Sequence, residues 1–72
     1  MRINKENWNT AEELRDRVYD AIDSIESAMT IARELGDESL RSSLNVKRVQ
    51  LKKKYDQLNK KLNAVYQKEI AS

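Results

Sequence analysis

The stretch that decides the fold is residues 44–70, LNVKRVQLKKKYDQLNKKLNAVYQKEI. Its seam of larger apolar residues advances in steps of three, four and seven: Leu44, Leu51, Tyr55, Leu58, Leu62 and Val65. This spacing keeps the seam on one side of an α-helix, which has 3.6 residues per turn. A helix with such a seam needs a neighbour to cover it. We therefore predict a helix over 38–70 that packs against another helix.

The covering helix is predicted in the first half of the chain. Apolar residues there also alternate in steps of three and four: Ala11, Leu14, Val18, Ala21, Ile25, Ala28, Ala32 and Leu35. Thr10 and Glu13 have the spacing of a capping box, so we expect this helix to span 11–35 after an irregular arm over 1–9. Ile22 and Met29 widen the apolar stripe beyond what one partner helix covers, so we expect them to stay exposed for a second copy.

The turn between the two helices is predicted at 36–37. Gly36 is the only glycine of a chain that has no proline, and it follows Leu35 where a left-handed residue ends a helix. Asp37 is suited to cap the next helix. Because so short a turn makes the helices antiparallel neighbours, we predict a single all-α domain over 1–72, a coiled-coil-like two-helix hairpin.

The chain has 72 residues and no cysteine, and such short chains depend on regular helix packing or on oligomerisation. We expect the hairpin to dimerise into a four-helix bundle, and another protein is a further expected partner. The residues predicted for an oligomer or partner interface are Leu14, Val18, Ile22, Ile25, Met29, Leu51, Tyr55, Leu58 and Leu62. Val46 and Val49 lie opposite the seam, either as isolated surface residues or as the edge of a second contact surface.

Charge is distributed unevenly along the chain. The first 36 residues hold five basic and eight acidic residues, and the remaining 36 hold nine basic and four acidic residues. The two halves are therefore electrostatically complementary, which favours their lying side by side. Arg48 falls on the seam of the second helix, where we expect it to meet an acidic residue such as Asp20 or Asp23.

The basic residues of the second helix allow an alternative function. The candidate nucleic-acid contacts are Lys47, Arg48, Lys52, Lys53, Lys54, Lys60 and Lys61. By helical phase they point in several directions, which favours a solvated, salt-bridging surface over a nucleic-acid footprint. Binding of RNA or DNA by a hairpin dimer stays the second hypothesis.

The sequence carries no signature of catalysis. There is no histidine, cysteine or glycine-rich loop, so the serine and threonine hydroxyls have no imidazole base, and we expect no catalytic, cofactor-binding or metal site. There is no apolar run long enough for a membrane span or a signal peptide, so we expect a cytoplasmic protein. The predicted function is a small, non-enzymatic protein–protein interaction module, of the assembly chaperone, adaptor or inhibitor type, that acts through exposed helix faces.

Overall fold

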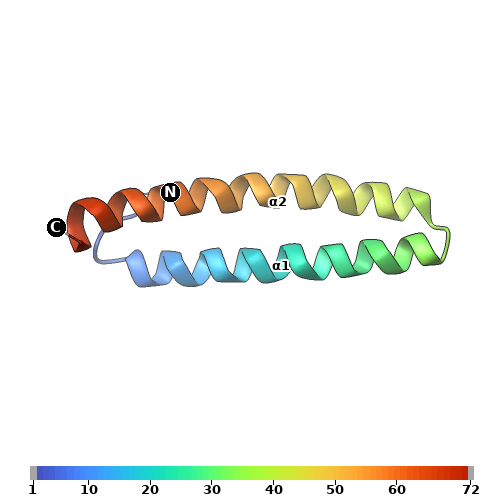
Figure 1. Cartoon of the computed structure of the whole chain (residues 1–72), viewed down its shortest axis with the longest axis horizontal. Helices are drawn as coiled ribbons and strands as arrows, with labels where there is room; N and C mark the ends of the chain where they lie inside the picture. Colours follow the sequence, from blue (N-terminus) through green and yellow to red (C-terminus); the bar gives the residue numbers. More distant parts are fainter. Residues whose placement is uncertain (1, 72) are drawn as a thin grey trace.

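The computed structural model describes residues 2–71 and shows a two-helix hairpin (Figure 1). Helix α1 spans Trp8–Glu34, helix α2 spans Glu38–Val65, and a π-helical segment, η1, continues α2 over Tyr66–Ile70. Helices α1 and α2 lie side by side and antiparallel, in a body of 52 × 16 × 14 Å. The predicted all-α hairpin is thus confirmed, although the regular α-helix stops short of Ile70.

The turn forms as the sequence indicates. Gly36 has a φ of 74°, in the left-handed region that favours glycine. Its amide donates to the carbonyl of Arg33 at 3.0 Å, and the amide of Asp37 donates to the carbonyl of Ala32 at 2.9 Å. These two bonds make a Schellman motif, which satisfies carbonyls at the end of α1. The Asp37 side chain then accepts from the amide of Leu40 at 3.0 Å and caps α2.

The predicted start of the first helix was wrong, because α1 begins at Trp8 and not at Ala11. The reciprocal bonding expected of Thr10 and Glu13 occurs further upstream, between Asn4 and Asn7. The Asn4 side chain accepts from the amide of Asn7 at 3.1 Å, and the Asn7 side chain accepts from the amide of Asn4 at 2.8 Å. This pair orders the residues before the helix, so the helix can begin one turn earlier.

The predicted exposure of Ile22 and Met29 is also not what the structure shows. Ile22 is only 8% exposed and Met29 is half-buried, so packing within the hairpin covers them. Residues 11, 18, 25 and 32 face α2 and repeat every seven positions. A helix with this repeat can bury, beside each of these residues, either the residue three positions later or the residue four positions later. In the hairpin the residues four positions later, Ile22 and Met29, lie between the helices, because they fill more of that space than Ala21 and Ala28 would.

The core is concentrated at the open end of the hairpin, where the N-terminal arm folds back over the end of α2 (Figure 1). Ile3 from the arm and Ala11 from α1 pack with Leu58 and Leu62, and Leu62 is only 1% exposed. The Trp8 indole nitrogen donates to the carbonyl of Leu62 at 3.1 Å. The arm and Trp8 therefore close this end of the hairpin.

Candidate functional site

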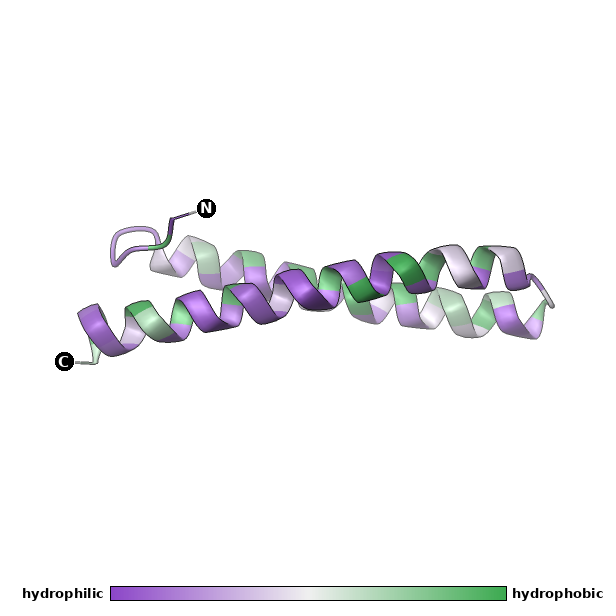
Figure 2. Ribbon diagram, turned by 90° about the horizontal axis from the view of Figure 1, so that it is seen from above, coloured by the Kyte–Doolittle hydropathy of each residue, from purple (hydrophilic) through white to green (hydrophobic). Residues whose placement is uncertain are grey.

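The hairpin has two long flanks of different composition. Because α1 and α2 are antiparallel, each flank contains one row of side chains from each helix, spaced by seven residues. We call one flank the lysine face, defined by two rows: Leu14, Ala21, Ala28 and Leu35 on α1 and in its cap, and Leu40, Lys47, Lys54 and Lys61 on α2. The opposite flank, the salt-bridge face, carries Arg15, Ile22, Met29, Arg41, Arg48 and Tyr55. Figure 2 shows how hydrophobic and hydrophilic residues alternate along both helices.

Hollows open along the lysine face. One of about 320 Å³ lies between Leu14 of α1 and Leu51 of α2, and Lys54 and Lys61 also line it. A second, of about 370 Å³, lies beside the turn and includes Ile31, Leu35 and Leu40. A third, of about 280 Å³, lies beside the N-terminal arm and is lined by Ile3, Thr10 and Leu14. The hollows therefore follow this face from one end of the hairpin to the other.

Large apolar side chains stay exposed around these hollows. Leu14 is 39% exposed, Ile31 58% and Leu35 80%, and Leu40 is exposed as well. Between the leucines of α1 stand Ala21 and Ala28, whose small side chains allow another backbone to approach closely. The lysine face thus offers a shallow apolar strip with room for a further element.

Charge in the two defining rows of the lysine face has one sign, although Asp37, the cap of α2, lines the hollow beside the turn. Neither of its two defining rows contains an aspartate or glutamate among the residues that the structure describes. Within residues 2–71, Lys47 and Lys54 form no ion pair with a carboxylate of the chain. Lysines seven residues apart stand about 10 Å apart along a helix. The apolar strip is therefore bordered by a regular row of positive charge.

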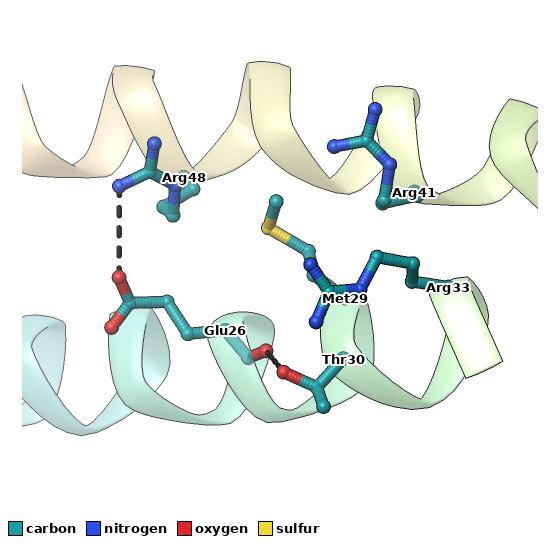
Figure 3. Close-up of a pocket in the computed structure, with 6 residues that line it drawn as sticks. All are labelled: Glu26, Met29, Thr30, Arg33, Arg41 and Arg48. Atoms are coloured by element: carbon teal, nitrogen blue, oxygen red, sulfur yellow. Dashed lines mark hydrogen bonds and ion pairs between the residues drawn. The ribbon is translucent and has the colours of Figure 1, made fainter.

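Charge on the salt-bridge face is partly compensated within the chain, by ion pairs of Arg41 and Arg48. A hollow of about 240 Å³ on this face is lined by Glu26, Met29, Thr30, Arg33, Arg41 and Arg48 (Figure 3). Arg48 pairs with Glu26 across the two helices at 3.6 Å and also donates to the side chain of Asn45. Arg41 pairs with Glu38 at 3.0 Å. Arg48 thus meets an acidic residue of α1, as predicted, but this residue is Glu26 and not Asp20 or Asp23.

The predicted interface residues do not form one exposed surface. Ile22, Leu58 and Leu62 are buried inside the hairpin, and Val18, Ile25, Met29, Leu51 and Tyr55 are half-buried. Only Leu14 among the predicted residues is exposed. The predicted interface did not include Ile31, Leu35 and Leu40, which are exposed. The signal that could have found the lysine face is the seven-residue spacing shared by the row that begins at Leu14 and the row that begins at Leu40.

The predicted nucleic-acid contacts are divided among three sides of α2. Lys47, Lys54 and Lys61 lie on the lysine face, and Arg48 and Lys52 lie toward the salt-bridge face. Lys53 and Lys60 lie on the back of α2 by helical phase. The hairpin thus does not bring these cations together on one surface.

Two features are absent from residues 2–71. No cluster of three or more histidine, cysteine, aspartate or glutamate side chains that could hold a metal ion occurs in residues 2–71. None of the helices in that part of the chain is long and apolar enough to cross a membrane.

Comparison of the sequence with models of protein families and with curated proteins, and of the structure with solved structures, finds no match.

Proposed function

We propose that the hairpin is a small, non-enzymatic protein–protein interaction module that docks another protein on its lysine face. The observation that carries the proposal is the apolar strip with its hollows, in which Ile31, Leu35 and Leu40 remain exposed, whereas the hollow described on the opposite flank is lined mostly by charged side chains. An exposed strip of this kind, bordered by charged residues, is typical of a surface that a partner covers.

The dimeric four-helix bundle expected from the sequence is a competing use of the same face. Helix α1 is suited to it, because Leu14, Ala21 and Ala28 could all enter a shared core. Helix α2 is not, because Lys47 and Lys54 occupy the corresponding positions. Burying ammonium groups from two copies without carboxylates costs several kcal/mol per charge. This cost favours a partner other than a second copy.

Photo-crosslinking tests the proposal. A photoreactive amino acid replaces Ile31 on the lysine face or, as a matched control, Val46 on the back of α2. The two positions are 58% and 56% exposed, so they differ in their place on the hairpin and hardly in accessibility. In the cells that make the protein, we expect position 31 to crosslink to another polypeptide and position 46 not to do so.

Two results would contradict the proposal. Equal crosslinking from both positions would show that the lysine face has no preference for a partner. Crosslinking from position 31 only to a second copy would replace the docking function with homodimerisation. Retention on RNA or heparin that weakens steeply as salt is raised would favour the nucleic-acid alternative, because lysine contacts to a polyanion depend on the release of its counterions.

A further inference from the structure

The lysine face is unusual in carrying its apolar row and its basic row on different helices. The apolar row, with Leu14, Ala21 and Ala28, belongs to α1, and the basic row, with Lys47 and Lys54, belongs to α2. The hollow of about 320 Å³ between the rows is lined by residues of both helices, among them Leu14 and Lys54. We call the space between the two rows the groove. A helix lying along the groove would touch apolar side chains of α1 on one side and ammonium groups of α2 on the other.

We propose that the groove binds an acidic amphipathic helix of another protein, which becomes the third helix of a mixed bundle. This inference rests on the proposed docking function and names the partner's chemistry. The partner helix packs apolar residues against Leu14, Ala21 and Ala28, and it places carboxylates beside Lys47 and Lys54. Because the lysines recur every seven residues, its carboxylates recur at the same interval along one flank.

Charge complementarity carries the choice of partner. The described rows of the lysine face contain no carboxylate, and Asp37, which lines the hollow beside the turn, already accepts from the amide of Leu40 as the cap of α2. Arg17, on the outer edge of the same side of α1, already pairs with Glu13 at 3.7 Å. A partner's carboxylates therefore gain more attraction by lying beside Lys47 and Lys54 than by lying beside Arg17. Such pairs fix the orientation and the register of a helix in a groove.

The dimensions of the face also fit a helix. The leucines at both ends of the apolar row, Leu14 and Leu35, are 21 residues apart, or about 31 Å along the helix axis. The small residues Ala21 and Ala28 lie between them, where an approaching helix needs space. A helix of six turns therefore matches the strip, and its large apolar residues would enter the hollows beside Leu51 and beside Leu40.

A displayed peptide library, selected on the full chain, tests the inference. The peptides are helical and about 28 residues long, which is about 42 Å. Each has leucine and alanine on one stripe and a free choice of Glu, Gln or Lys on both flanks. We expect the recovered peptides to carry Glu at seven-residue intervals on one flank only.

Binding of a recovered peptide to two double variants then locates the charges. The first variant, Lys47→Gln with Lys54→Gln, should bind about five- to tenfold more weakly, because it removes two charge pairs at the edge of the groove. The matched control, Lys53→Gln with Lys60→Gln, removes the same charge from the back of α2 and should bind within about twofold of the original chain. Circular dichroism shows whether each variant keeps its helices.

Each other outcome overturns the inference in a distinguishable way. One such outcome is that the recovered peptides show no preference for Glu and bind the Lys47 and Lys54 variant as tightly as the original chain. This result would refute the acidic partner but would not contradict docking on the apolar strip. No recovered peptide would overturn both proposals. A third outcome is that no Glu-rich peptide is recovered, but the chain binds heparin or phosphatidylserine vesicles and loses this binding when Lys47 and Lys54 are substituted. That outcome would show that the lysine face binds polyanions and not an acidic helix.

Discussion

The replacement of Ile22 by alanine should destabilise the hairpin by about 2 kcal/mol. Ile22 is 8% exposed, and full burial of an isoleucine side chain stabilises a fold by roughly 1.5–3 kcal/mol. Alanine retains only the first carbon of that side chain, and its better helix propensity recovers at most about 0.5 kcal/mol. A chain of this length has a free energy of unfolding of roughly 4–10 kcal/mol, so the loss should be a large fraction of it.

Urea unfolding followed by circular dichroism measures this effect. With a slope of about 1 kcal/mol per molar urea, the midpoint should fall by roughly 2 M. The matched control is the same substitution at Ile31, which is on the same helix but 58% exposed. Its lost burial is mostly offset by helix propensity, so the free energy of unfolding should change by less than about 0.5 kcal/mol.

Equal effects of the two substitutions, or a larger loss of stability from Ile31→Ala, would contradict the burial of Ile22 between the helices. Either result would mean that α1 is rotated, with the flank of Ala21 and Ala28 facing α2. The measurement should be repeated over a range of protein concentrations. A loss at Ile22 that appears only at high concentration would place this residue in a contact between copies.

Four further substitutions test the turn, the helix start and the contact of Trp8 with α2. Gly36→Ala should lower stability by about 1 kcal/mol through its φ of 74° alone, since an added Cβ meets nothing within 4 Å; an unchanged melting temperature would contradict this. Asn4→Ala should cost about 1 kcal/mol in urea unfolding and Thr10→Ala less than about 0.5 kcal/mol, and the reverse order would restore Thr10 as the cap. Trp8→Phe replaces the indole by a smaller aromatic ring and removes the bond to the Leu62 carbonyl, which together should cost at least about 1 kcal/mol in thermal unfolding; no loss would show that neither the bond nor the larger ring contributes.

The sequence was most informative where the local chemistry allows few conformations. Gly36 and Asp37 have residue types that specify a helix end and a helix start, and both occur as predicted. The sequence was less informative at the first helix start, because Asn4 with Asn7 and Thr10 with Glu13 both have the spacing of a reciprocal cap. The contact of the arm with α2 decides between them, since Ile3 reaches the core only if the chain turns before Trp8.

The rotation of α1 could not be read from its own sequence. The seven-residue repeat of Ala11, Val18 and Ile25 fits an inward position for either Ala21 or Ile22. Only the space left by α2 decides, and that depends on long-range packing. The lysine face follows from this rotation, so the candidate docking surface emerged only when both helices were placed together.

The claim that the lysine face is open in the isolated chain and covered by another protein can be tested by cysteine labelling. The chain has no cysteine, so Ser24→Cys and Val46→Cys each introduce a single thiol. Ser24 is exposed and lies seven residues before Ile31, at the α1 edge of the lysine face, and Val46 lies on the back of α2. Both thiols should react with a maleimide at similar rates in the purified protein, and only the one at position 24 should be protected in the cells that make it. Equal rates in cells, or protection of position 24 in the purified protein, would contradict the claim.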